Sequence, residues 1–221
     1  MLTDRSNIEM VTVDKRKERK KILDAVTRQD IIDAVAATLI SEGTQGFTMD
    51  KVATKAGVAK GTLYTHFKSK EEAIEVTMDS IIEPLSVTLD TIVSSDLTPA
   101  EKLTKYTSLH FAFFDDHQDL FRVILYDREQ AHAPKERFQN NRYWQFVKKL
   151  AGIIEDGVNR GEFIPLPPLK ISSMFIEANI ALVMQRLANK VTGNIVEDVE
   201  LVMKVFLRGI LLNPDAKQKE V

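Results

Sequence analysis

Apolar residues recur along most of the chain at the three- and four-residue spacing of an α-helix, and sustained alternation of apolar and polar residues is missing. This pattern predicts an all-α fold of about nine helices. Thr27 and Asp30 supply capping side chains for the first helix, which Gly43 should end. The apolar face of that helix is formed by Ile31, Ile32, Val35, Leu39 and Ile40.

A long helix is predicted from Ser69 to about residue 94. Ser69 and Glu72 match a capping box, in which each side chain bonds the backbone N–H of the other residue. Pro84 lies inside this helix and lacks the N–H of one helical hydrogen bond. We therefore expect a bend near Ile81 or Ile82, unless the chain breaks there into two helices.

Five more helices are expected in the remainder of the chain, over about residues 98–115, 118–130, 134–161, 168–190 and 194–212. The first of them has the clearest start, because Thr98, Pro99 and Glu101 combine an N-cap, a first-turn proline and a capping-box glutamate. The last should begin with Asn194 as its cap and Glu197 three residues later.

Composition adds limits to this picture. With 44% hydrophobic and 28% charged residues among 221, the chain has the composition of a folded globular protein. It has no cysteine, which excludes disulfides and thiolate metal sites, and no apolar run long enough to cross a membrane. We expect a cytoplasmic protein that needs neither a metal nor another cofactor.

Charge is divided unevenly along the chain. Residues 1–70 contain 13 lysines and arginines against 9 aspartates and glutamates, whereas residues 71–221 contain 17 against 23. A basic first third indicates that this part meets a polyanion. Its densest run, residues 15–21, has six positive charges and one negative. This run predicts either an arm that contacts phosphates or an extension of the first helix, and a solvated tail is an equal alternative.

Two short helices are predicted after the first one, over residues 48–56 and 60–66. Ala53 is small where two helices would cross closely, and Gly57 can take the left-handed conformation of a tight turn. Three helices joined in this way are typical of a helix-turn-helix, whose last helix enters the major groove of DNA.

The helix over residues 60–66 has two different faces. Leu63 and Phe67 are four residues apart and should pack inward together. The opposite face is small, polar and aromatic, and consists of Gly61 and Thr65 flanked by Thr62, Tyr64 and His66, with Lys60 at the tip. A seven-residue helix is about 10 Å long, which suits insertion of its N-terminal end into a groove about 12 Å wide. These residues predict a surface that binds double-stranded DNA.

At this point the chain resembles the TetR family of bacterial transcriptional repressors. The matching residues are Ile31-Ile32-Asp33-Ala34, Gly43, Thr48, Val52-Ala53, Ala56-Gly57-Val58, Lys60-Gly61-Thr62-Leu63-Tyr64, His66-Phe67 and Ser69-Lys70-Glu71. The resemblance implies that the bases are faced by Lys60, Gly61, Thr62 and Thr65, and that phosphates are held by Thr48, Tyr64, His66 and Lys70. It also implies a dimer, and a larger helical domain after the helix-turn-helix.

Two residues depart from the family's pattern. Ala59 stands where the family commonly has a serine as the cap of the recognition helix, which removes a capping hydroxyl worth about 0.5–2 kcal/mol. Asp50 stands where some members carry a basic residue that reads bases. We expect Asp50 to interact with the helix dipole or to pair with a neighbour.

The chain is predicted to have four parts: a basic arm or helix extension at residues 1–26, a helix-turn-helix domain at 27–72, an effector-binding and dimerisation domain at 73–214, and a tail at 215–221. The penultimate predicted helix is apolar almost all round, as in a helix buried on two sides, and the last helix adds further apolar residues. They predict a homodimer interface of Phe175, Ala178, Leu182, Val202, Phe206 and Ile210.

Aromatic residues crowd the middle helices, where a pocket for an apolar or aromatic effector is plausible. We assign to this pocket Phe111, Phe114, Phe121, Tyr126, Trp144, Phe175 and Asn179, although aromatic spacing on helices more often marks a simple core. Residues 115–119 have metal-binding side chains but are expected to form a helix end and cap. His110 and His132 are isolated, and we expect ordinary packed or surface histidines.

Taken together, these features predict a homodimeric repressor that binds a palindromic operator and is released by a small-molecule effector. An effector-independent DNA-binding or adaptor protein on the same fold is one alternative. An α-helical enzyme is another, and the lack of a recognisable catalytic constellation counts against it.

Overall fold

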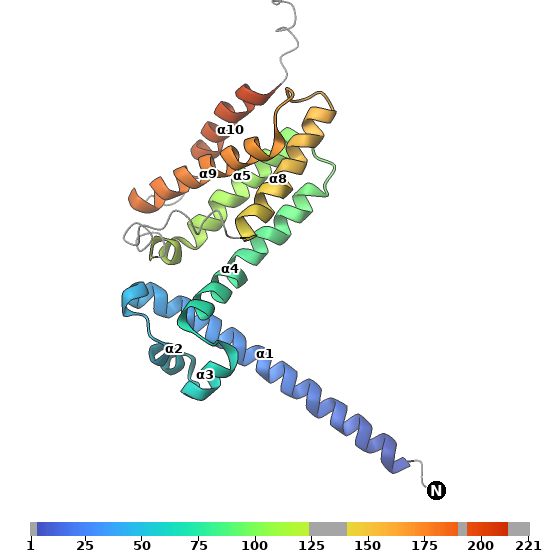
Figure 1. Cartoon of the computed structure of the whole chain (residues 1–221), viewed down its shortest axis with the longest axis vertical. Coiled ribbons are helices and arrows are strands. Elements are labelled where there is room, and N and C mark those ends of the chain that lie inside the picture. Colours follow the sequence, from blue (N-terminus) through green and yellow to red (C-terminus); the bar gives the residue numbers. More distant parts are fainter. Residues whose placement is uncertain (1–3, 124–140, 190–193, 212–221) are drawn as a thin grey trace, which may run out of the picture. The chain divides into compact units, whose positions relative to one another are not determined.

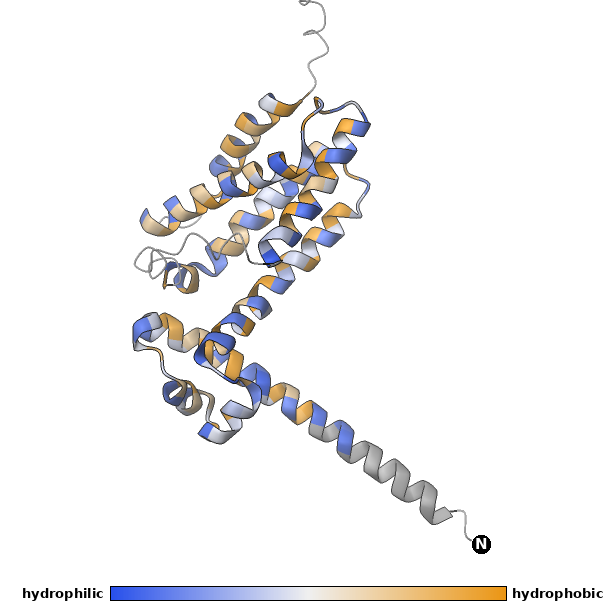
Figure 2. Ribbon diagram, viewed as in Figure 1, coloured by the Kyte–Doolittle hydropathy of each residue, from blue (hydrophilic) through white to orange (hydrophobic). Residues whose placement is uncertain are grey.

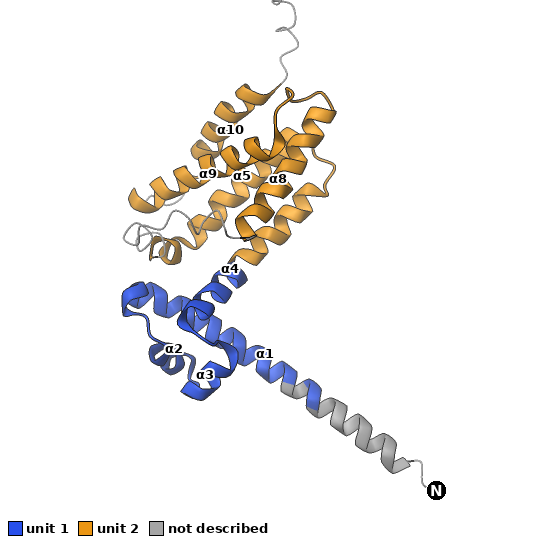
Figure 3. Ribbon diagram, viewed as in Figure 1, with its two compact units in different colours: residues 1–81 blue, residues 82–221 orange. Residues whose placement is uncertain are grey.

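The computed structural model describes residues 4–123, 141–189 and 194–211. These residues form helices and loops, and the one β-type pairing among them is an isolated bridge between Phe163 and Leu211. Packing divides the chain into two compact units, Met1–Ile81 and Ile82–Val221 (Figure 3). The division falls inside a helix, so that its first turns belong to one unit and its last turns to the other.

The first unit contains α1 (Asp4–Gly46), α2 (Met49–Ala56), α3 (Lys60–His66) and the first turns of α4 (Lys70–Val93), as Figure 1 shows. The short helix α2 packs against both α1 and α3. A shared apolar core is built from Ile31, Val35, Leu39, Val52, Leu63, Phe67 and Ala73, all of them almost fully buried. The predicted bounds of α3 are confirmed, and α2 begins one residue later than predicted because Thr48 is its N-cap.

The start of α1 was predicted wrongly. The helix begins at Asp4 and runs through Thr27, whose hydroxyl donates to the Leu23 carbonyl inside the helix instead of capping its end. Residues 4–42 contain neither glycine nor proline, so nothing in this stretch separates the possible cap at Thr27 from a helix that precedes it. The basic run continues the helix, and contact of its side chains with phosphates stays a prediction. Gly43 does interrupt the helix, with φ 68° and ψ 174°.

The long helix α4 is continuous through Pro84, so the alternative of two separate helices is excluded. Its start differs in one detail from the predicted capping box. The Ser69 hydroxyl accepts from the Glu72 N–H at 3.1 Å, but the Glu72 carboxylate accepts from the N–H of Lys68 and not of Ser69. The carboxylate still satisfies a free N–H before the first helical turn, one residue earlier than expected.

The second unit contains the remainder of α4, then α5 (Pro99–Asp116), α8 (Asn141–Asn159), α9 (Pro168–Asn189) and α10 (Val196–Ile210). Residues 118–123 are also helical, which makes nine helical segments in the described parts of the chain. Helix α5 contacts α8, α9 and α10, and α8 packs along α9. Apolar residues are spread along α9 and α10 (Figure 2). The predicted all-α class is confirmed.

Two helix starts in this unit show how far local signals reach. Thr98 and Glu101 form the complete predicted capping box of α5. The predicted cap of α10 is wrong, because Ile195 occupies the N-cap position. Asn194 lies one residue earlier with φ 36°, and its side-chain amide donates to Glu197 Oε1 at 2.9 Å. Asn194 tolerates this left-handed conformation well, so it serves the turn before the helix. Residues 124–130 of the helix predicted at 118–130, and residues 134–140 of the one predicted at 134–161, lie outside the described residues.

An ion-pair network joins three helices of the second unit. The Arg186 guanidinium of α9 bonds Asp115 of α5 at 3.2 Å and Asp198 of α10 at 2.6 Å. The Arg186 side chain is 10% exposed, whereas its two partners keep 23% and 27%. Removal of the cation would leave two carboxylates close together in a partly buried place.

Replacement Arg186→Ala should therefore lower the free energy of unfolding by about 2–3 kcal/mol, less than for fully buried pairs because the carboxylates retain contact with water. Urea unfolding followed by circular dichroism would measure this. The matched control is Arg160→Ala, whose partner Asp156 lies on the surface of α8 and whose side chain is 48% exposed. The control should cost less than about 1 kcal/mol. Equal losses in the two variants would contradict a role for the three-helix network.

Candidate nucleic-acid interface

The turn between α2 and α3 has the geometry of a helix-turn-helix. Thr48 caps α2, with its hydroxyl accepting from the Lys51 N–H at 3.3 Å. Gly57 ends the helix with φ 67° and ψ 25°, a left-handed conformation that a side chain would strain. The N–H of the next residue, Val58, donates to the Ala53 carbonyl at 3.0 Å, which tightens the turn into α3. The turn directs α3 across α2.

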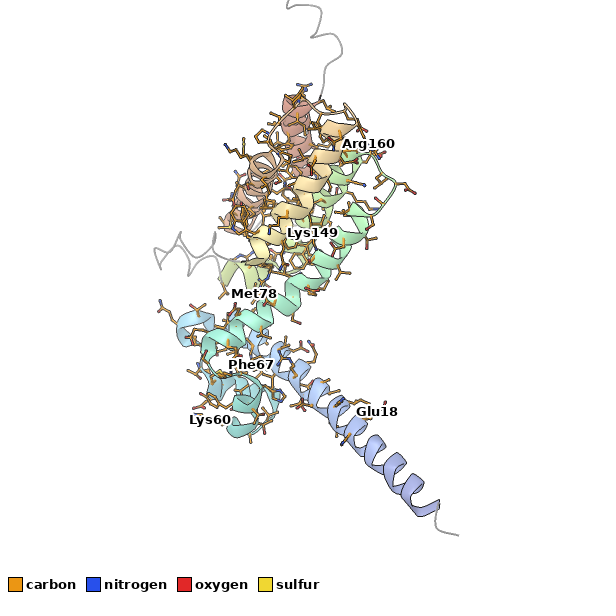
Figure 4. The ribbon with its side chains drawn as sticks, turned by 45° about the vertical axis from the view of Figure 1, so that its right-hand side comes forward. Glu18, Lys60, Phe67, Met78, Lys149 and Arg160 are labelled. Carbon is orange, nitrogen blue, oxygen red and sulfur yellow. The ribbon has the colours of Figure 1, made fainter. Side chains whose placement is uncertain are left out.

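The third helix is anchored by one face only. Leu63 is 0% exposed and Phe67, directly after the helix, is 1% exposed. On the other side Lys60, Gly61 and Thr65 are exposed, and Tyr64 is 45% exposed. Lys60 and Phe67 are labelled in Figure 4. Within the described part of the first unit, the predicted DNA-facing side of α3 is therefore open to a partner.

The surroundings of Gly61 show whether packing within the chain explains this glycine. A Cβ built at this position would have no atom within 4 Å, and φ is not in the left-handed region. The fold of the described chain thus gives no reason for a glycine in a helix, where glycine is less stable than alanine by about 0.5–1 kcal/mol. Close approach of another molecule to the helix backbone is a physical reason for it.

Lys60 and Asp50 form an ion pair across the helix-turn-helix, with 2.7 Å between the ammonium and the carboxylate. Asp50 raises the pKa of Lys60, first through the hydrogen bond and then through its charge. Both side chains are more than half exposed, so the pair adds little stability. The prediction that Asp50 pairs with a neighbour is confirmed. Asp50 also holds the Lys60 ammonium near the exposed tip of α3.

Besides Thr48, two of the predicted phosphate-binding residues make side-chain contacts inside the first unit. The His66 side chain is only 9% exposed, and its Nε2 lies 3.7 Å from Asp24 Oδ1 of α1. The Lys70 ammonium donates to the Thr44 carbonyl at 2.6 Å and lies 5.4 Å from the centre of the Phe47 ring. Lys70 thus binds the last turn of α1 and, at 3.4 Å, the Phe47 carbonyl directly after it. A phosphate would have to share or replace these contacts, and the role of both residues in DNA binding stays a prediction.

The remaining residues at or near the predicted surface are Ala59, Thr62 and Lys68. Ala59 occupies the N-cap of α3 and makes no side-chain capping bond, as the sequence implied. Thr62 is half-buried, and its carbonyl accepts from the Thr65 hydroxyl at 2.6 Å. Sequence reasoning did not assign Lys68, which is exposed directly beyond Phe67. The signal for Lys68 in the sequence was its position directly after Phe67, the buried residue at the end of α3.

Comparisons with known proteins agree with this geometry. The family model described as "Bacterial regulatory proteins, tetR family" matches residues 31–82, and "Tetracyclin repressor-like, C-terminal domain" matches residues 96–182. The HTH-type transcriptional repressor KstR2 of Mycolicibacterium smegmatis is 31% identical over 144 residues, which cover 63% of this chain and 69% of that protein. The fatty acid metabolism regulator protein of Bacillus subtilis is 26% identical over 132 residues, 60% of this chain and 68% of the relative.

The chain belongs to the TetR family. Solved structures show the same fold. FadR of Bacillus subtilis, in complex with stearoyl-CoA, has a TM-score of 0.73 and 23% identity, and covers 82% of this chain and 98% of its own. FadR of Bacillus halodurans has a TM-score of 0.72 and 19% identity, with 83% and 95% covered.

Membership of the TetR family makes this chain a transcription regulator with a DNA-binding helix-turn-helix, and excludes the enzyme alternative. Asp115 and His117, from the stretch with metal-binding residue types, have other contacts. Asp115 bonds Arg186, and His117 caps the end of α5 while its Nδ1 lies 2.9 Å from the Phe113 carbonyl. In the described ranges, no helix combines the length and the apolar character needed to cross a bilayer.

The predicted effector residues of this TetR-family chain fall into separate groups. The rings of Phe114 and Phe121 lie 4.3 Å apart, near the end of α5. Phe175 and Asn179 are fully buried, one turn apart on α9. The other assigned positions differ: Phe111 is buried, Trp144 is 37% exposed on α8 beside Tyr143, and Tyr126 lies outside the described residues. The structure thus brings together two pairs and leaves Trp144 at the surface.

The predicted interface residues also divide. Phe175, Val202 and Ile210 are buried within the second unit, so they contribute to the core of the single chain. Ala178 is exposed, whereas Leu182 and Phe206 are half-buried. The sequence could not separate these faces, because α9 is apolar nearly all round. The exposed large apolar side chains of these two helices are Leu169, Met174, Val196, Leu201 and Val205.

A Gly61→Ala variant separates folding from DNA binding. Its thermal midpoint should rise by about 1–4 °C, because alanine favours the helix and the methyl group meets no atom of the chain. Affinity for a duplex selected by the wild-type protein should fall about tenfold or more, if the bases or backbone of DNA approach Gly61. Fluorescence anisotropy would measure the binding.

The matched control is Gly152→Ala, because Gly152 is also exposed inside a helix with no atom within 4 Å of a built Cβ. This control should gain similar stability and keep DNA affinity unchanged. Unchanged affinity in Gly61→Ala would show that DNA does not closely approach this part of α3.

Proposed function

We propose that the protein is a homodimeric transcriptional repressor that binds a palindromic operator and releases it when an apolar small molecule binds the second unit. The observation that best supports this proposal is the open face of α3, where a glycine without a packing role lies among polar and aromatic side chains. Because operator DNA lies in the cytoplasm, the protein would act there.

On the operator, α3 of each subunit enters a major groove. Base edges are met by Lys60, Gly61, Thr62 and Thr65, and phosphates by Thr48, Tyr64, His66 and Lys70. Lys60 would exchange its exposed pairing with Asp50 for DNA, which costs little because water already screens the pair. A two-fold dimer would separate its two α3 helices by about 34–36 Å, one turn of the duplex.

The dimer is supported by exposed apolar residues on the last two helices. Met174, Ala178 and Ala181 lie at helical spacing along one exposed side of α9, and Met174 is 64% exposed. Leu201 and Val205 are 51% and 68% exposed, one turn apart on α10. A second copy of the same surface could cover both stripes, as an isologous interface requires.

An apolar effector is supported by the aromatic and buried interior of the second unit, and by relatives named as fatty acid regulators. The complex of Bacillus subtilis FadR with stearoyl-CoA makes long acyl chains a reasonable first class to test. Helix α4 would transmit the effect, because its first turns pack in the DNA-binding unit and its last turns in the other. A difference in effector affinity of about 1–3 kcal/mol between two states is enough for regulation.

Selection of bound duplexes from a random library by the purified full-length protein tests the proposal. We expect enrichment of an inverted repeat whose half-sites lie one helical turn apart, bound in a salt-dependent way. Enrichment of no sequence, or of a single half-site bound by a monomer, would refute the dimeric repressor. Operator that no acyl chain or aromatic compound releases would instead favour the effector-independent alternative.

The dimer surface can be tested with charge. Met174→Glu and Val205→Glu should each shift the protein toward the monomer in sedimentation velocity, because a carboxylate would be buried in the apolar interface. Operator affinity should fall about hundredfold with the loss of the second reading head. Val87→Glu is the matched control, since Val87 is 54% exposed on α4 and lies outside the proposed interface. A dimer that survives both α9 and α10 substitutions would contradict this interface.

A further inference from the structure

The second unit holds two buried polar atoms that its described residues leave unpaired. Nδ1 of His110 and Oδ1 of Asn179 have no hydrogen-bond partner, although their side chains are only 3% and 0% exposed. Nearly all buried polar atoms in folded proteins are paired, because an unpaired one has lost its bond to water. These two atoms therefore indicate a place where another molecule supplies hydrogen bonds.

The two side chains lie at the same level of neighbouring helices. The Tyr106 ring of α5 lies 6.1 Å from the Phe175 ring of α9, and further along Asp115 bonds Arg186 at 3.2 Å. The second contact lies nearer the C-terminal end of both helices than the first. Helices α5 and α9 therefore run in the same direction. His110 follows Tyr106 by one turn and Asn179 follows Phe175 by one turn. This register places His110 and Asn179 at the same level of the two helices, one turn beyond the Tyr106–Phe175 contact.

The hydrogen-bonding capacity of the pair can be specified. The Asn179 amide nitrogen donates to the Phe175 carbonyl at 2.8 Å, and because a carbonyl only accepts, this contact determines which end of the amide is oxygen. Oδ1 therefore requires a donor. Burial lowers the pKa of His110 to about 3, so the ring is neutral near pH 7. A neutral ring can present Nδ1 as an N–H donor.

The surroundings favour an uncharged, apolar molecule. The His110 ring lies 4.7 Å from the Phe114 ring and 5.6 Å from the Tyr106 ring. Arg186, a buried cation that joins α9 to α5, is already bound by Asp115 and Asp198. A carboxylate would bring a charge to an aromatic environment and could give no proton to Asn179. With Nδ1 of His110 as the N–H donor, the ligand group that satisfies both atoms is neutral, donates to Asn179 and accepts from His110.

We propose that His110 and Asn179 bind a hydroxyl group on an apolar effector. The hydroxyl donates its proton to Asn179 Oδ1 and accepts the N–H of His110 Nδ1. An ether or ester oxygen at the same place satisfies only His110 and leaves Asn179 unpaired. The inference rests on the proposed function for the effector role, whereas the hydroxyl site itself depends only on the two side chains.

Matched chemical pairs test the donor requirement in the full-length protein. The probes are 1-dodecanol with dodecyl methyl ether, and 2-naphthol with 2-methoxynaphthalene. At least one alcohol should raise the thermal midpoint and bind about tenfold to a hundredfold more tightly than its ether in calorimetry, because the ether leaves a buried acceptor unpaired. Equal affinity within both pairs, or no binding by either alcohol, would overturn the proposal.

Variants locate the effect. Asn179→Leu should abolish the preference for the alcohol while the ligand-free protein remains as stable or becomes more so, because the leucine replaces an unpaired oxygen by an apolar group. His110→Phe should also abolish it. Thr77→Val is the matched control, since Thr77 Oγ1 is likewise buried without a partner but belongs to the first unit. Retention of the preference in Asn179→Leu, or its loss in Thr77→Val, would overturn the site.

Two further readouts separate this site from the regulator function. The ¹⁵N shift of His110 Nδ1 should change on addition of the alcohol and not of the ether. Operator binding is measured in the same samples. A hydroxyl-dependent shift without operator release would support the site and refute effector control. Operator release by alcohol and ether alike would refute the site and leave the repressor function standing.

Discussion

The burial of two side chains, Leu63 and Phe67, orients the element on which DNA binding depends. A helix of seven residues is too short to be stable alone in water, so α3 exists because these residues pack on α1 and α2. The same packing determines which residues face outward. The exposed side of α3 is thus a consequence of core formation, and its polar and small residues lie on the side that is open to a partner.

Polar side chains have different roles in the two units. In the first, the Lys70 ammonium bonds the Thr44 carbonyl in the last turn of α1, and Thr48 satisfies the start of α2. These bonds position α2 and α3 without DNA. In the second, Arg186 is fully engaged, whereas His110 and Asn179 keep unpaired atoms deep between α5 and α9. Such atoms reduce stability, and a ligand that pairs them would stabilise the state in which it binds.

Local signals in the sequence were sufficient for much of the fold. The capping box at Thr98 and the left-handed glycine at position 57 are interactions among residues close in the chain, so sequence spacing alone predicts them. The errors have the same origin. Thr27 had the residue type of a cap, but the residues around it continued the helix. Asn194 also had the residue type of a cap, but it lies in the turn one residue before the N-cap position of α10.

For the candidate DNA surface, the sequence by itself determined the alternation of inward and outward residues on α3 and, through its motif, membership of the TetR family. Both depend on helical spacing and on residue types that occur within about 45 positions. Only the tertiary structure decided that His66 faces Asp24, that Lys70 binds the last turn of α1, and that His110 and Asn179 are each buried with an atom unpaired. These contacts join segments from different helices, and their distances depend on how the helices pack.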